Sequence, residues 1–254
     1  MKIAIVCYPT FGGSGVVATE LGLELAKRGH EIHFITYSQP VRLALLSKNV
    51  YYHEVHVPEY PLFHYQPYEL ALSSKLVDMI KLYGIELLHV HYAIPHAYAG
   101  YMAKKMLQDE GINIPMVTTL HGTDITLVGN HPYYKPAVSF SINHSDCVTS
   151  VSQSLKDDTY RLFDIDKEIV VIPNFIENNK ELLKKDEPCH RSLMANEDEK
   201  IITHISNFRK VKRIDDVVKI FYEIQKEVPS KLMMVGEGPE KEAAENLCAQ
   251  LKIH

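Results

Sequence analysis

The first 36 residues constrain the fold most, because they read as a strand, a glycine-rich turn, a helix and a second strand. The apolar run 2–7 is typical of a buried parallel strand, and residues 8–15 form the turn. From Val16 the apolar residues recur with helical spacing until Gly29, and 31–36 is the second strand. A right-handed βαβ unit places its turn at the carboxyl edge of a parallel sheet, where open α/β folds bind ligands.

Gly13, Ser14 and Gly15 in this turn are candidate substrate-binding residues. Glycines let the backbone come close to a ligand, and the helix N-terminus beyond them offers unpaired N–H groups to an anion. The same stretch fits the loose dinucleotide pattern G-x-G-x-x-G/A. An NAD site, however, requires an Asp or Glu after the second strand to hold the ribose hydroxyls. Here Thr36 is followed by Tyr-Ser-Gln. An ordinary βα turn and an NAD oxidoreductase stay as alternatives, and the missing acid counts against the second.

The composition is ordinary for a soluble globular protein, with 46% apolar and 23% charged residues in a chain of 254. The net charge of −5 gives no basic footprint for nucleic acid, and the apolar runs are too short for a membrane span. The four cysteines form no C-x-x-C pair, which is typical of cytosolic cysteine usage. The chain enters its first strand at once, which leaves no room for a signal peptide. We therefore expect a cytoplasmic protein without nucleic-acid binding or stable membrane association.

Strand-like and helix-like segments alternate along the rest of the chain, which argues for an α/β fold with a parallel, doubly wound sheet. Strands are expected at 50–57, 85–91, 115–120, 146–151, 168–172, 201–205 and 231–235, and helices at 68–83, 97–108 and 214–227. A last helix is expected to reach the final residue.

The polar stretch 174–200 predicts a linker and surface segment between one domain at 1–173 and the start of a second at 201–254. Two parallel strands after the linker bury too little surface to stand alone. We therefore expect the second domain to be incomplete and the chain to be a fragment. The alternative is that this half pairs with another chain, which leaves a homo-oligomer open.

Several motifs together resemble the retaining glycosyltransferases that use a nucleotide-sugar and fold as two facing Rossmann-like domains, the GT-B type. These motifs lie at 7–15, 29–36, 89–96, 118–124, 206–213 and 235–239, and Thr-Leu-His-Gly-Thr-Asp at 119–124 belongs to the sharpest of them. The resemblance covers the whole chain. It implies two Rossmann-like domains with parallel sheets, an acceptor-side domain at 1–173 and a truncated donor-side domain at 201–254.

Within this family, the chain resembles members that move N-acetylglucosamine from UDP-N-acetylglucosamine to L-malate with retention, the first step of bacillithiol biosynthesis. The resemblance implies no cofactor and no metal. The family's Glu-(seven residues)-Glu motif lies beyond the end of this chain. A nucleotide-binding module without catalysis is therefore the alternative from another class.

The candidate catalytic residues are His121, Arg209 and Lys212. His121 follows a predicted strand, and the family uses this histidine to contact the transferred sugar near the reacting carbon. A packed or capping histidine is the alternative. Arg209 and Lys212 follow another predicted strand, where such charges could neutralise a diphosphate leaving group without a metal. The alternative for this pair is a solvated charge run.

The resemblance also implies further substrate contacts, with Tyr92 on the acceptor and the turn at 236–239 as a wall against the nucleotide. The remaining candidates are Tyr92, Thr119, Asp124, Asn207, Gly236 and Glu237. The chain departs from the family at two positions. Asn207 stands where many relatives carry Arg, and Ser139 stands where close relatives carry an Arg that would suit an acceptor carboxylate.

A histidine cluster offers a different chemistry. His89 and His91 alternate on one predicted strand face, with His96 beyond, and H-x-H at a strand end can bind zinc. Such a site would fit a metal-dependent hydrolase. Only three candidates cluster and no acid stands within the motif, so we expect no metal here.

Overall fold

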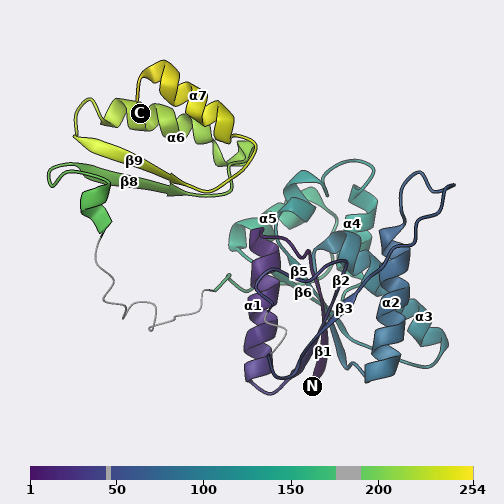
Figure 1. The fold of residues 1–254 in the computed structure, drawn as a ribbon. Helices are drawn as coiled ribbons and strands as arrows, with labels where there is room; N and C mark the ends of the chain where they lie inside the picture. Colours follow the sequence, from purple (N-terminus) through teal and green to yellow (C-terminus); the bar gives the residue numbers. More distant parts are fainter. Residues whose placement is uncertain (44–46, 176–189, 254) are drawn as a thin grey trace. The chain divides into compact units, whose positions relative to one another are not determined.

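The computed structural model describes residues 1–43, 47–175 and 190–253. The chain forms two compact units, Met1–Glu177 and Asn178–His254, and each is an α/β arrangement (Figure 1). The predicted linker falls largely on 176–189, which lie outside the described residues. The predicted domain bounds therefore stay a prediction.

The first unit contains a parallel sheet in the order β3-β2-β1-β4-β5-β6-β7, which confirms the predicted α/β class. Its strands are β1 Lys2–Val6, β2 Glu31–Thr36, β3 Val50–Glu54, β4 Leu87–His91, β5 Met116–Leu120, β6 Cys147–Ser150 and β7 Ile169–Val171. The chain moves outward from β1 to β3 and then returns to the other side of β1 with β4. The loops after β1 and β4 therefore diverge, and this switch point is where doubly wound sheets bind ligands.

Helices cover both faces of this sheet (Figure 1). They are α1 Gly13–Lys27, α2 Tyr68–Tyr83, α3 Tyr98–Asp109, α4 Lys135–Asn143 and α5 Gln153–Leu162. Successive side chains of a strand point to opposite faces, so Ile5 packs in the cluster beneath α1, and Val6 packs in the cluster beneath α2 and α3. Leu72 and Leu76 of α2 are completely buried, and each contributes about 1.5–3 kcal/mol through burial.

The second unit pairs β8 Lys200–Ile205 in parallel with β9 Ser230–Val235. Helices α6 Ile214–Ile224 and α7 Lys241–Leu251 lie over one face of this small sheet (Figure 1). Apolar residues at helical spacing form one stripe of α6, and Ile214, Val218 and Phe221 are its buried members.

Several element ends differ from the sequence predictions, among them the end of α6 at Ile224 rather than at residue 227. Helix α1 begins at Gly13 rather than Val16, so the glycines form its first turn. Strand β3 ends at Glu54 rather than at residue 57, because it pairs there with the last residue of β2. The prediction that the final helix reaches the last residue is wrong. Helix α7 ends at Leu251, because Lys252 turns left-handed at φ 56°.

Candidate active site

Three sequence-predicted residues meet at the carboxyl edge of β1, β4 and β5. Ser14 lies in the first turn of α1, while Tyr92 and His121 directly follow β4 and β5. The Tyr92 hydroxyl donates to Ser14 Oγ at 2.9 Å, and the rings of Tyr92 and His121 lie 5.3 Å apart between centroids. The sheet edge thus brings together side chains that are up to 107 positions apart, from 14 to 121.

Tyr92 has a strained backbone, with φ 85° and ψ 136°. Residues other than glycine pay an energetic cost there and keep such a conformation only when their surroundings hold it. The Tyr92 N–H donates to the Thr119 carbonyl at 2.9 Å, and its ring packs edge-on against Tyr8. Burial raises the pKa of the Tyr92 hydroxyl, which keeps it a neutral donor. Strain held at a switch point supports a functional role for this residue.

The glycine turn divides into an open position and a packed one. A Cβ on Gly13 would meet no atom within 4 Å, so this backbone is open to a ligand. A Cβ on Gly15 would lie 2.5 Å from the carbonyl oxygens of both Tyr8 and Thr10. Gly15 is therefore required by packing within the chain, whereas we expected it to serve ligand approach.

Asp124 lies beneath the site and holds two loops together. Its carboxylate accepts backbone N–H bonds from Ala93 at 2.9 Å, Gly122 at 3.0 Å and His121 at 3.2 Å. Its side chain is buried, and burial raises its pKa to about 6 against the opposing effect of these backbone bonds. The loops after β4 and β5 are thus tied to one carboxylate, so Asp124 positions the backbone of His121.

Thr119 also lies below the surface. It is 9% exposed, and its hydroxyl is already bonded to Thr149 Oγ1 at 2.7 Å and His89 Nε2 at 2.8 Å. We therefore assign Thr119 a supporting role under the site rather than direct substrate contact.

The histidines that suggested a metal site form a neutral column instead. His91 Nδ1 lies 2.8 Å from His121 Nε2, and the His96 ring N–H bonds the His91 carbonyl at 2.5 Å. Burial lowers the pKa of His96 and of His121 to about 4, so both are neutral at pH 7. Across the described residues, no group of three or more His, Cys, Asp or Glu side chains is arranged to hold a metal ion.

A hollow of about 520 Å³ opens beside Tyr92. Its lining includes four tyrosines and two carboxylates: Tyr8, Tyr92, Tyr98, Tyr134, Glu69 and Asp124. The described residues that line it include no Lys or Arg, and Ser139 of α4 is not among them. The described residues of the hollow offer hydroxyl groups and apolar surface to a ligand, but no cation for a carboxylate.

In the second unit, Arg209 and Lys212 frame a short turn directly after β8. Both side chains are exposed, and the Lys212 N–H donates to the Arg209 carbonyl at 2.7 Å. Among the residues that the structure describes, neither has an ion-pair partner, whereas the neighbouring Arg213 pairs with Asp216 at 2.5 Å. Two exposed positive charges without a described ion-pair partner and the exposed Asn207 therefore stand together at this strand end. Their role at a diphosphate stays a prediction.

The turn after β9 packs directly against this segment. The Phe208 N–H donates to the Glu237 carbonyl at 2.9 Å. Gly236 has φ 141°, and a Cβ there would lie 1.8 Å from the Ser206 carbonyl oxygen, so only glycine allows this approach. The backbone thus brings the two predicted donor-side motifs together.

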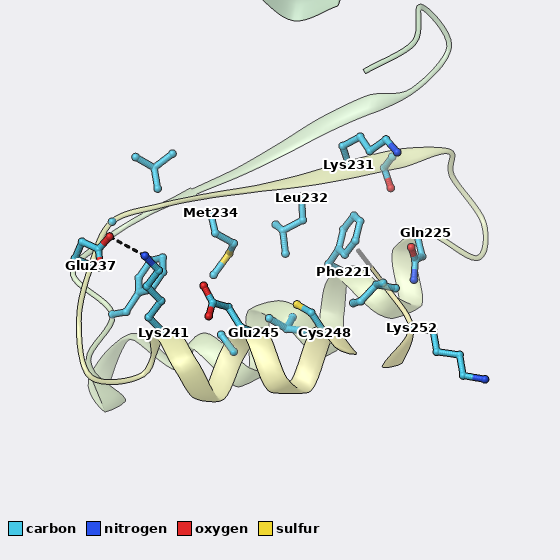
Figure 2. A pocket seen from close by; sticks show the side chains of 17 residues that line it. Phe221, Gln225, Lys231, Leu232, Met234, Glu237, Lys241, Glu245, Cys248 and Lys252 are labelled. Carbon is cyan, nitrogen blue, oxygen red and sulfur yellow. Dashed lines mark hydrogen bonds and ion pairs between the residues drawn. The ribbon is translucent and has the colours of Figure 1, made fainter. Parts of the chain in front are cut away.

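The hollow drawn in Figure 2 lies beside these motifs rather than at the basic turn. It measures about 790 Å³ and separates β9 from α7, with Leu232 and Met234 pointing toward the helix. Glu237 borders it and pairs with Lys241 at 2.8 Å. Arg209 and Lys212 do not line it. We therefore attribute this hollow to packing of the small sheet and place the candidate donor contacts on the exposed turn.

Sequence reasoning missed Tyr8 and Tyr98, which line the hollow beside Tyr92. Tyr8 comes just after β1 at the carboxyl edge, so its position was a usable signal. Tyr98 begins α3, and its proximity to the site depends on how the chain turns after β4. That turn could not be read from periodicity.

Two family models cover most of the sequence. A model of glycosyltransferase family 4 matches residues 11–180, and one of glycosyl transferases group 1 matches residues 185–254. The first match alone covers more than half of the chain. The chain therefore belongs to glycosyltransferase family 4.

Among curated relatives, the chain is 50% identical over 240 residues to N-acetyl-alpha-D-glucosaminyl L-malate synthase of Bacillus anthracis. This match covers 94% of the chain and 62% of that relative. The chain is also 26% identical to an uncharacterized glycosyltransferase of Methanocaldococcus jannaschii. This match covers 100% of the chain and 67% of that relative. The chain thus spans about two thirds of the length of these relatives.

Solved structures share the fold. A Rickettsia africae glycosyltransferase superimposes with a TM-score of 0.69 at 20% identity, over 99% of the chain and 65% of that protein. Anabaena HepE, solved in complex with UDP-glucose, gives 0.71 at 15% identity, over 100% of the chain and 67% of that protein. These neighbours support the GT-B assignment. None of the described helices is long and apolar enough to cross a membrane.

Proposed function

We propose that the protein moves N-acetylglucosamine from UDP-N-acetylglucosamine to the hydroxyl of L-malate with retention of configuration, as the first step of bacillithiol biosynthesis. The observation that carries this proposal is the 50% identity, over 240 residues, to a relative whose name states this product. The unpaired Cys7, Cys147 and Cys248 support a cytoplasmic setting.

The reaction breaks the bond between the anomeric carbon and the phosphate oxygen of the donor. A new bond forms from that carbon to the malate hydroxyl oxygen, and the hydroxyl proton is released with UDP. Negative charge develops on the leaving diphosphate, and we assign Arg209 and Lys212 to meet it. Their exposure and their lack of described ion-pair partners support this role, because fixed charges aimed at developing charge lower a barrier.

On the acceptor side, we assign contacts to Ser14 and Tyr92 and place the neutral His121 against the transferred sugar. The hydroxyl pair at 2.9 Å and the open backbone at Gly13 support an acceptor site at this edge. The described residues that line the hollow beside Tyr92 include no cation, and Ser139 stands where the family resemblance implies an Arg. The acceptor therefore has to bind through hydroxyl and backbone groups at this edge, which an assay with malate tests directly.

The full-length protein, incubated with UDP-N-acetylglucosamine and L-malate, should release UDP and form the malate glycoside. A neutral alcohol such as glycerol is the matched acceptor control. Turnover with glycerol but not with malate would overturn the acceptor and keep the glycosyltransferase class. Binding of UDP without turnover on any acceptor would favour the nucleotide-binding module instead.

A further inference from the structure

His91 is completely buried, and its ring is bonded to His121 of the candidate site. Its Nδ1 lies 2.8 Å from Nε2 of His121, so one hydrogen is shared between the two rings. Its other nitrogen, Nε2, has no hydrogen-bond partner among the described residues. His89 stacks on its ring at 4.7 Å between centroids, which restrains the plane of the His91 ring.

The unpartnered nitrogen decides which ring donates. If His121 donated its Nε2 hydrogen, a neutral His91 would carry its own hydrogen on Nε2, as a buried N–H without an acceptor. Such orphan donors are rare in proteins and cost their full desolvation energy. If His91 donates from Nδ1 instead, its Nε2 is a bare lone pair, which is the less costly arrangement.

His96 shows the same arrangement next to His91. Its Nδ1 faces the His91 carbonyl at 2.5 Å, and a carbonyl can only accept, so Nδ1 carries the hydrogen. The unpartnered Nε2 of His96 is therefore bare when the ring is neutral. Both buried rings thus keep their hydrogen on Nδ1, and their bare nitrogens are the ones without partners.

We propose that His91 is a positioning residue that fixes the tautomer of His121, so that His121 presents a protonated Nδ1 to the site. When Nε2 of a neutral imidazole accepts a hydrogen bond, the hydrogen of that ring must lie on Nδ1. His121 Nδ1 has no hydrogen bond to the described residues, and the side chain is only partly buried. The ring therefore offers a donor to an oxygen of the bound sugar, whereas the other tautomer could only accept.

The consequence for turnover rests on the proposed function, but the tautomer itself does not. Full-length protein carrying 15N-labelled histidine gives separate signals for protonated and bare ring nitrogens in a long-range proton–nitrogen spectrum. His121→Gln identifies the signals by their loss. We expect protonated Nδ1 and bare Nε2 for His121 from pH 6 to 8, and the reverse pattern would overturn the proposal.

His91→Phe keeps the volume of the ring but removes the donor. We expect the His121 signals to lose their single Nδ1-protonated form and kcat to fall about tenfold, the loss of one hydrogen bond, with little change in donor KM. His91→Asn can still donate from about the position of Nδ1 and should recover part of kcat. His89→Phe keeps an aromatic ring against His91 and removes no hydrogen bond to His121, so it is the matched control and should leave the His121 signals unchanged.

An unchanged His121 spectrum in His91→Phe would contradict the assignment. If that chain fails to fold, the wild-type spectrum still decides the tautomer, and His91→Asn provides the kinetic comparison. If the wild-type protein turns over no donor, the proposed function fails while the spectrum remains a test of His91.

Discussion

Among single residues, Lys212 gives the sharpest test of the donor site. Its side chain is exposed and has no ion-pair partner among the described residues, so Lys212→Ala should change the free energy of unfolding by less than about 0.5 kcal/mol. Loss of a charge that faces a developing diphosphate should lower kcat by about 10²-fold. A thermal melt and a steady-state assay of the full-length protein measure the two effects separately.

Lys219→Ala is the matched control for Lys212. Lys219 is also an exposed lysine of the second unit, but it pairs with Asp215 at 3.3 Å on α6. It should keep both melting temperature and turnover. Wild-type turnover in Lys212→Ala would mean that the basic turn is only a solvated surface and that the donor assignment is wrong.

Gly13 and Gly15 in the first turn of α1 should differ in how much stability they lose on substitution by alanine. Gly15→Ala forces a Cβ within 2.5 Å of two carbonyl oxygens and should destabilise the first unit by about 1–3 kcal/mol. Gly13→Ala meets open space and should leave the unfolding free energy nearly unchanged. Chemical denaturation of both variants measures the difference, and equal stability would show that the turn is not packed as described.

At the scale of secondary-structure elements, Asp124 connects the turns after β4 and β5. Asp124→Asn leaves one acceptor oxygen for three N–H groups and turns an amide donor toward at least one of them. We expect a loss of about 1–3 kcal/mol in unfolding free energy and a lower kcat, because the backbone of His121 loses a support. Asp109→Asn, an exposed carboxylate at the end of α3, is the control. A shift no larger than that of the control would remove Asp124 from this role.

The same elements show which features of the site could be predicted from the sequence. Strand-end positions of Tyr92 and His121 followed from apolar runs and the rule that ligands bind at the carboxyl edge, so their meeting was predictable. The roles of Gly15, Thr119 and Asp124 were not, because each depends on contacts with a different strand or loop. Periodicity reports which face of an element is apolar. It does not report which carbonyl or hydroxyl of another element lies 2.5–3 Å away.

For the whole molecule, family membership and fold extend over both units, but the site evidence comes from each unit separately. Met1–Glu177 supplies the hydroxyl pair and the histidine column, and the second unit supplies the basic turn. The chain covers 62% of its Bacillus anthracis relative. Kinetic tests therefore use the full-length protein. A folding test can report on one unit alone if its spectroscopic probe lies in that unit.

The buried histidines should make the first unit sensitive to acid. Burial lowers the pKa of His89, His96 and His121 from 6.5 to about 4 and holds that of His91 well below 6.5, so the unfolded chain binds more protons than the native one below pH 6.5. Their stability contribution is fully present above pH 6.5 and is lost as pH falls toward 4.

Asp124, whose pKa burial raises to about 6, acts in the opposite direction, because the native state holds its proton as pH falls. Four protons taken up by these histidines and one released by Asp124 leave a net uptake of about three near pH 5. His53, whose pKa burial also lowers to about 4, adds about one more, and His33, whose pKa burial also lowers, adds in the same direction. Denaturant unfolding followed by tyrosine absorbance reports on this unit, since Tyr222 alone of the tyrosines lies outside it. His96→Phe should reduce the uptake by about one proton. Stability that stays constant between pH 7 and 5 would contradict the neutral, buried histidine column.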